Sequence, residues 1–194
     1  LAAPPQLAHH PLAHDGLLAG VVQDVELPEG QQELAFDVLR RLPVGPLGLY
    51  TAPHLVSPEE RIRVDGTKIS PRALRDGFRS AERLSPEGDP MTWFEAMTWT
   101  ACDWFRRKGA RFVVMEAGLG GRWAATSACR GAVSVITTGG IDHREWLGKT
   151  LGRIAGETAG SLRRGAPLVT GRVRPAARAA VLLHSDQRSF SCGE

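Results

Sequence analysis

Two residues with metal-binding side chains, Glu116 and His143, follow apolar runs that have the composition of buried strands. Residues 112–115 precede Glu116, and the β-branched run 132–138 comes shortly before His143. Central parallel strands are apolar on both faces, and open α/β sheets bind ligands just beyond the carboxyl ends of their strands. The sequence therefore predicts that Glu116 and His143 lie at adjacent strand ends and face one crevice, where they could share a hard metal ion.

Each of these two residues also has a structural alternative. A carboxylate that ends inside a core without a partner costs several kcal/mol, so Glu116 must reach the sheet edge or meet a cation. It could instead cap backbone amides of the glycine turn at residues 118–121. His143 precedes a helical pattern and could be a first-turn histidine without a metal.

Five segments resemble one known family, the folylpolyglutamate synthases and dihydrofolate synthases of the Mur ligase superfamily. They occur in the family's order and spacing and comprise residues 48–70, 92–105, 113–128, 133–160 and 165–171. The resemblance implies a three-layer α/β fold, in which helices flank a mainly parallel sheet. This fold is like the Mur ligase central domain, is related to the P-loop NTPases, and is truncated here. The implied activity is ATP-driven ligation of glutamate to folate or dihydropteroate through an acyl phosphate.

The same resemblance implies the site. Glu116 and His143 would hold Mg²⁺, which bridges the bound ATP, and Pro53 and His54 would lie near the substrate. No catalytic side chain is assigned by the resemblance. The cofactors implied are therefore Mg²⁺ and ATP, and the partners implied are folate or dihydropteroate together with glutamate.

The chain departs from the family pattern at three places. Residues 21–30, VVQDVELPEG, stand where the family has a Gly-Lys-Gly-Ser phosphate loop, and their three acidic side chains would repel a triphosphate. Ala52 replaces a serine that binds magnesium in the family, and Thr158 replaces a lysine carried as a carbamate. We therefore expect the chain to be inactive by itself.

Composition limits the class of protein. The chain has 194 residues, of which 42% are hydrophobic, so it can bury one substantial core. The formal charge of +3 is not concentrated beside aromatic residues, which gives little support to a nucleic-acid surface. Three cysteines without CxxC spacing indicate free thiols. No apolar run approaches the roughly 18 residues of a membrane span, and no signal pattern is present, so we expect no membrane partner and a cytoplasmic location.

The chain divides into three regions by pattern. Residues 1–30 are rich in Pro, Ala and Gly and are expected to be poorly ordered, residues 31–171 form the partial ATPase domain, and residues 172–194 form a tail. A sheet that ends with the strand at residues 167–170 would leave an exposed edge. Self-association through that edge is therefore expected.

Besides the helix expected at residues 145–160, three helices are predicted within the central region. The first, residues 31–42, would bury one apolar face made of Leu34, Ala35, Val38, Leu39 and Leu42. Ser70 caps a second helix, whose buried face would comprise Leu74, Phe78, Ala81 and Leu84. Thr92 and Glu95 form the capping box of a third helix, whose aromatic residues are expected to be core.

Three functional hypotheses remain open at this point. The chain is a partial or frame-shifted member of the ligase family, or it is a pseudoenzyme that binds folate, nucleotide or another subunit. The third hypothesis is a different Mur-type amide ligase. A Gly-Lys-Gly-Ser loop encoded upstream of Gly48 in another reading frame would decide between the first two.

Overall fold

The computed structural model describes residues 18–23, 31–43, 45–118, 124–129, 131–136, 165–171 and 189–191, together with single residues at 159, 162, 175, 179 and 181. Its strands form one sheet of eight. In chain order they are β1 (Leu18–Gln23), β2 (Leu47–Tyr50), β3 (Ile62–Val64), β4 (Thr67–Lys68), β5 (Phe112–Glu116), β6 (Gly131–Ile136), β7 (Leu168–Thr170) and β8 (Ser189–Ser191).

The sheet has the strand order β4-β3-β2-β5-β1-β6-β7-β8. All pairings from β2 across to β8 are parallel, whereas β2–β3 and β3–β4 are antiparallel. The β3–β4 connection is a two-residue turn, as the Asp65–Gly66 pair predicts, and the two residues have φ values of 49° and 82°. A mainly parallel sheet is therefore confirmed.

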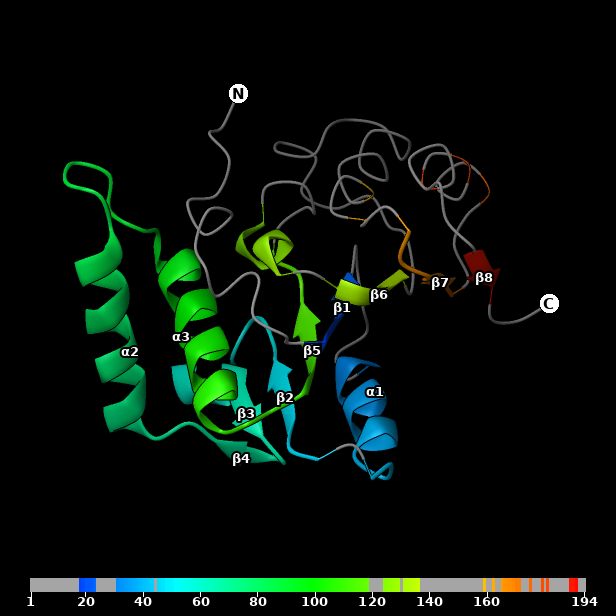
Figure 1. Cartoon of the computed structure of the whole chain (residues 1–194), viewed down its shortest axis with the longest axis horizontal. Helices are drawn as coiled ribbons and strands as arrows, with labels where there is room; N and C mark the ends of the chain where they lie inside the picture. Colours follow the sequence, from blue (N-terminus) through cyan, green and yellow to red (C-terminus); the bar gives the residue numbers. More distant parts are fainter. Residues whose placement is uncertain are drawn as a thin grey trace.

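Helices cover both faces of this sheet (Figure 1). On one face, Phe36 of α1 (Gln31–Leu39) packs against Leu49 of β2 and Val114 of β5. On the other, α3 (Trp93–Arg107) contributes Phe105 to a core cluster that includes Val113. The alternation of Val113 and Val114 between the two faces follows the period of two in a strand. Together with α2 (Pro71–Leu84), which packs on α3, these elements form the expected three layers.

Two of the predicted helix caps are present. The Ser70 side chain accepts a hydrogen bond from the backbone N–H of Ala73 at 3.2 Å, with Pro71 in the first turn. In α3 the backbone N–H of Thr92 donates to Glu95 Oε2 at 2.8 Å, and that of Glu95 donates to Thr92 Oγ1 at 3.3 Å. Each cap satisfies amide groups that would otherwise have no partner within the helix.

The predicted buried faces of two helices need correction. In the first helix Phe36 is the buried residue, at 5% exposure, while Val38 and Leu42 are 55% and 51% exposed. The helix ends at Leu39, and Val38 lies about 200° around the helix axis from Phe36, so it faces solvent. Leu84, in the last turn of α2, is 44% exposed rather than buried.

The poorly ordered N-terminal segment expected at residues 1–30 contains strand β1, which lies between β5 and β6. In the sequence LAGVVQ of β1, Gly20 interrupts a short apolar run, so the run does not show a clear strand pattern. The tail expected at residues 172–194 contributes β8, which pairs with β7. The expectation that residues 167–170 form the sheet edge is therefore wrong for the described part of the chain.

Within the described part of the chain, none of the helices combines the length and the apolar character that a membrane span requires.

Two thiols lie close together in the core. The Sγ atoms of Cys102 and Cys129 are 3.5 Å apart, and neither residue forms a disulfide. The hydrogen bond between Cys102 and Cys129, together with the burial of Cys102, raises the pKa of the Cys102 thiol well above its ordinary value. Because the thiolate is the reactive form, Cys102 is a poor nucleophile.

The two helices on one face are in close contact at Gly77 of α2. A Cβ added there would lie 2.7 Å from Thr100 Oγ1 and 3.0 Å from Thr100 Cβ, where no real Cβ fits without a shift. The sequence predicts only that Gly77 weakens its helix. The structure shows that it also allows α2 to contact α3.

We expect Gly77→Ala to destabilise the protein in spite of the better helix propensity of alanine. Overpacking costs about 1 to 3 kcal/mol, against a gain of about 1 kcal/mol from replacing a helical glycine, so the net loss should be up to about 2 kcal/mol. Urea unfolding of the variant and the wild-type chain measures this change in the free energy of unfolding. In the background of Thr100→Ala, which removes the nearest atoms, the same change should be neutral or stabilising. Equal destabilisation in both backgrounds would contradict the packing explanation.

Candidate ligand site at the carboxyl edge of the sheet

Glu116 ends β5 at the carboxyl edge of the sheet, where it is half-buried. Its Oε2 accepts a hydrogen bond of 2.7 Å from the backbone N–H of Ala52, which follows β2. This charge-assisted bond offsets part of the cost of burying the carboxylate. The prediction that Glu116 reaches the sheet edge is confirmed. The backbone amide that donates this hydrogen bond belongs to the loop after β2. Residues 119–121 of the glycine turn lie outside the described residues, so the capping of that turn stays a prediction.

Residues 51–57, here called the proline loop, connect β2 to the short 3-10 helix Pro58–Arg61. The Ala52–Pro53 peptide bond is cis, and the Thr51 N–H donates to the Arg61 carbonyl at 3.0 Å, which closes the loop at its base. Glu60 supports the other end by accepting hydrogen bonds from the backbone amides of Leu55, Val56 and Ser57 at 3.0, 3.3 and 3.2 Å. The loop is therefore held by carboxylates at both ends.

The middle of the proline loop is held by a stack of three side chains. Arg61 Nε donates to His54 Nδ1 at 2.9 Å, and the Arg61 guanidinium lies 4.9 Å from the centroid of the Trp93 ring. The His54 and Trp93 ring centroids are 6.4 Å apart. Because Nδ1 is the acceptor, the geometry assigns the neutral tautomer with its proton on Nε2. His54 therefore has one ring N–H left to donate to a ligand.

The turn after β5 begins against an aromatic ring from α3. A Cβ at Gly118 would lie 2.7 Å from Cζ of Phe94, so only glycine leaves this ring in place. Phe94 belongs to the first turn of α3, and the contact places that end of the helix at the carboxyl edge of β5. Glu116, the proline loop and the start of α3 thus meet at one edge of the sheet.

The predicted metal pair is only partly within the described chain. His143 lies outside the described residues, so its partnership with Glu116 stays a prediction. Strand β1 separates β5 from β6, which corrects the expectation that the two residues end adjacent strands. With strands about 4.8 Å apart, the two strand ends are roughly 10 Å from one another. Among the described residues, no group of three His, Cys, Asp or Glu side chains could hold a metal ion.

The two predicted substrate-binding residues occupy the proline loop. Pro53 is exposed and His54 is half-buried in its contact with Arg61. Their contact with substrate stays a prediction. Of residues 21–30, which stand where the family has its phosphate loop, 21–23 belong to β1 and 24–30 lie outside the described residues.

Sequence reasoning missed the three residues that hold the proline loop. The Ser57-x-x-Glu60 spacing is that of a capping box and could have identified Glu60. Arg61 is only 8% exposed although it precedes a strand, and no local pattern predicts its burial. Trp93 was assigned to the core with the other aromatic residues of its helix, but it is 48% exposed.

The proline loop should respond to pH through Glu60. Hydrogen bonds from the Val56 and Leu55 amides, helped by Lys68 at 3.2 Å, lower the pKa of Glu60 from 4.5 to about 2. The stabilisation is therefore complete above about pH 4.5 and is lost as the pH falls through about 2. We expect amide exchange at Leu55 and Val56, corrected for intrinsic rates, to accelerate over that range.

The matched variants are Glu60→Gln and Glu59→Gln. Glu60→Gln should give fast exchange at Leu55 and Val56 already at neutral pH, because a neutral amide accepts weaker hydrogen bonds than a carboxylate. Glu59→Gln removes the same charge one residue away and should leave both exchange rates unchanged. Similar rates in the two variants would show that Glu60 does not hold the loop.

A parallel α/β sheet with polar side chains gathered at its carboxyl edge defines a ligand-binding α/β domain. Comparison of the sequence with curated proteins identifies its relatives, although no family model matches the chain. A probable bifunctional folylpolyglutamate synthase/dihydropteroate synthase of Haloferax volcanii is 37% identical over 147 residues, covering 74% of this chain and 18% of that protein. The dihydrofolate synthase/folylpolyglutamate synthase of Bacillus subtilis is 37% identical over 149 residues, covering 73% and 34% respectively.

Solved structures give the same relationship. The apo form of L. casei FPGS matches with a TM-score of 0.81 and 27% identity, covering 98% of this chain and 50% of that chain. An FPGS–AMPPCP–folate complex matches with a TM-score of 0.80 and 29% identity over 95% of this chain and 47% of that one. Over about three quarters of its length the chain is similar to folylpolyglutamate and dihydrofolate synthases, and it spans between 18% and 34% of the length of the two curated relatives.

Proposed function

We propose that this chain is part of an ATP-dependent ligase that adds glutamate to folate or dihydropteroate through an acyl phosphate. The observation that carries the proposal is the 2.7 Å hydrogen bond from Ala52 to Glu116, which joins the proline loop to the end of β5. It places a carboxylate beside the loop that contains Pro53 and His54. Substrate and nucleotide would meet at this edge of the sheet.

The roles of the individual residues follow from their chemistry. His54 would donate its Nε2–H to an oxygen or nitrogen of the substrate, and Pro53 would offer an exposed apolar surface beside it. The Ala52 side chain has no atom that can bind a cation. The loop would therefore orient the substrate, while charge neutralisation would have to come from elsewhere in the intact protein.

Glu116 fits Mg²⁺ as one carboxylate ligand. A carboxylate has about four lone-pair sites, so accepting the Ala52 N–H leaves capacity for a cation. Mg²⁺ is usually bound by one or two carboxylates together with substrate phosphates and water. Bound with ATP, the ion would neutralise phosphate charge, and His143 is the second ligand that the sequence predicts.

Titration of the chain with folate, followed by amide and imidazole NMR signals, tests the substrate part of the proposal. We expect the Ala52 amide and the His54 ring to shift with a common saturation curve. His54→Ala should weaken folate binding about three- to tenfold, since one hydrogen bond contributes about 0.5 to 1.5 kcal/mol.

Leu55→Ala is the matched control, because Leu55 is the next residue of the loop and is 80% exposed. It should leave folate affinity unchanged. Saturable binding that leaves the proline loop signals in place, or equal losses in the two variants, would exclude the loop as the substrate site. A separate titration with Mg²⁺ alone tests the metal part, with weak shifts expected around Glu116 because one or two protein ligands leave the ion largely hydrated.

A further inference from the structure

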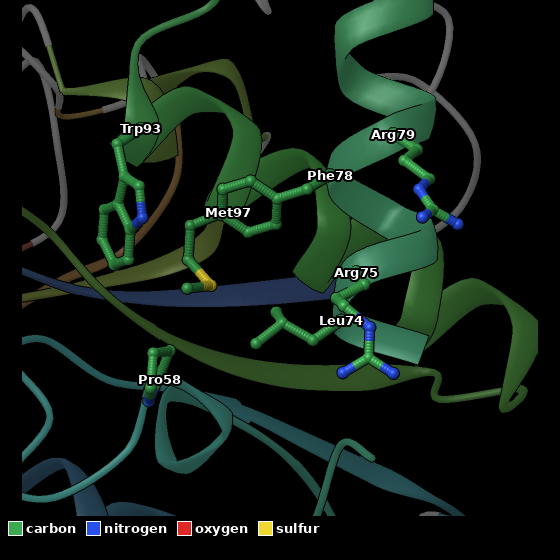
Figure 2. Close-up of a pocket in the computed structure, with 7 residues that line it drawn as sticks. All are labelled: Pro58, Leu74, Arg75, Phe78, Arg79, Trp93 and Met97. Atoms are coloured by element: carbon green, nitrogen blue, oxygen red, sulfur yellow. The ribbon is translucent and has the colours of Figure 1, made fainter. Parts of the chain in front are cut away.

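A pocket adjoins the carboxyl-edge site, between the outer helix α2, the start of α3 and the 3-10 helix that follows the proline loop. Its volume is about 380 Å³, which is within the range of small-molecule sites. Figure 2 shows Leu74 and Phe78 of α2, Trp93 and Met97 of α3, and Pro58 turned toward one common space, with Arg75 and Arg79 along the α2 edge. We call this space the arginine-edge pocket.

The wall of the pocket is an aromatic pair. The Phe78 and Trp93 rings have centroids 6.1 Å apart and an interplanar angle of 51°, which is a favourable tilted arrangement. Trp93 is 48% exposed, although its helix has other positions that bury indole rings, such as Trp99 at 5%. The capping box at Thr92 and the cation–π contact with Arg61 hold Trp93 in place. A large aromatic ring is thus presented to a ligand from a rigid position.

The edge of the pocket is positively charged. Arg75 and Arg79 are exposed and lie one turn apart on α2. Asp76 neutralises part of this charge, since its carboxylate is 3.7 Å from Arg79 and 3.9 Å from Arg72. Within the described part of the chain, Arg75 makes no hydrogen bond or ion pair. A planar guanidinium in this setting is suited to a carboxylate, which it can bind through two parallel hydrogen bonds.

We propose that the arginine-edge pocket binds a small aromatic carboxylate. The ring would pack on Trp93 and Phe78 above Met97 and Leu74, where it removes apolar surface from water, and the carboxylate would pair with Arg75. A ring alone would leave Arg75 hydrated, and a carboxylate without a ring would leave the apolar wall in water, so a ligand with both parts should bind most tightly. This inference does not depend on the proposed ligase activity.

The test is titration of the purified chain with benzoate, followed through the Trp93 indole N–H and the Phe78 and Met97 signals. Benzyl alcohol, which keeps the ring without the charge, and acetate, which keeps the charge without the ring, are the comparison ligands. We expect saturable shifts with benzoate and affinities at least about threefold lower for both comparison ligands.

Arg75→Gln and Arg83→Gln are the matched variants, since each removes one positive charge from α2 and Arg83 does not line the pocket. Arg75→Gln should weaken benzoate binding about three- to tenfold, as expected for an exposed charge-assisted pair, and Arg83→Gln should not. Trp93→Leu should abolish the binding, with its unfolding temperature measured to confirm that the chain still folds.

Three results would overturn the proposal. Absence of saturable shifts with benzoate in the wild-type chain would show that the pocket is not a site for this class of ligand. Equal affinity for benzyl alcohol would show that Arg75 contributes nothing to recognition. Equal losses in Arg75→Gln and Arg83→Gln would assign the effect to overall charge.

Discussion

Purified chain supplied with ATP, Mg²⁺, glutamate and dihydropteroate or tetrahydrofolate should form no ADP above the background of the assay. Phosphoryl transfer depends on positioning and on neutralising charge, which a phosphate loop supplies through backbone amides and a lysine. Residues 21–30 contain three carboxylates and a proline and have no lysine. Removing one hydrogen-bond donor that stabilises developing charge lowers the rate by a factor on the order of 10² to 10³. In this chain the whole phosphate-binding loop is replaced.

Substituting serine for Ala52 and lysine for Thr158 should not restore activity, because neither change supplies the missing phosphate loop. A relative that has the Gly-Lys-Gly-Ser loop serves as the positive control under the same conditions. If the chain does form ADP, the Glu116→Ala variant decides whether a contaminating ligase is responsible. Turnover that disappears in Glu116→Ala would mean that this fold binds triphosphate without its usual loop.

Replacing Arg61 by alanine should lower the free energy of unfolding by about 2 to 4 kcal/mol, the sum expected from a charge-assisted hydrogen bond and a partly buried cation–π contact. Arg61 is 8% exposed, and it joins His54 at 2.9 Å to the Trp93 ring at 4.9 Å. Its removal leaves His54 Nδ1 without this donor and Trp93 without the guanidinium beside its ring. Urea unfolding measures the loss, and imidazole NMR signals should show a mixture of His54 tautomers.

Arg75→Ala is the control for this prediction, because Arg75 is exposed and makes no hydrogen bond or ion pair in the described part of the chain. A change at such a surface position should stay within about 0.5 kcal/mol. An Arg61→Ala variant as stable as Arg75→Ala would show that the stack with His54 and Trp93 does not hold the proline loop.

Local patterns determined several helix ends and turns. The Ser70 cap, the Thr92–Glu95 capping box and the Asp65–Gly66 turn each join residues no more than three positions apart, so their chemistry is visible in a short stretch of sequence. The apolar run before Glu116 likewise predicts a strand that ends at the sheet edge. The resemblance to the ligase family then identified that edge as the candidate site.

Only the tertiary structure decided which groups meet there. Glu116 is 64 positions from Ala52, so no local pattern predicts the hydrogen bond between them. The insertion of β1 between β5 and β6, the burial of Phe36 in place of Val38 and the exposure of Trp93 have the same origin. A local sequence pattern shows that a residue belongs to an apolar face or that a carboxylate must find a partner. Which partner it finds depends on strand order and helix packing, because these set the distances between residues remote in the chain.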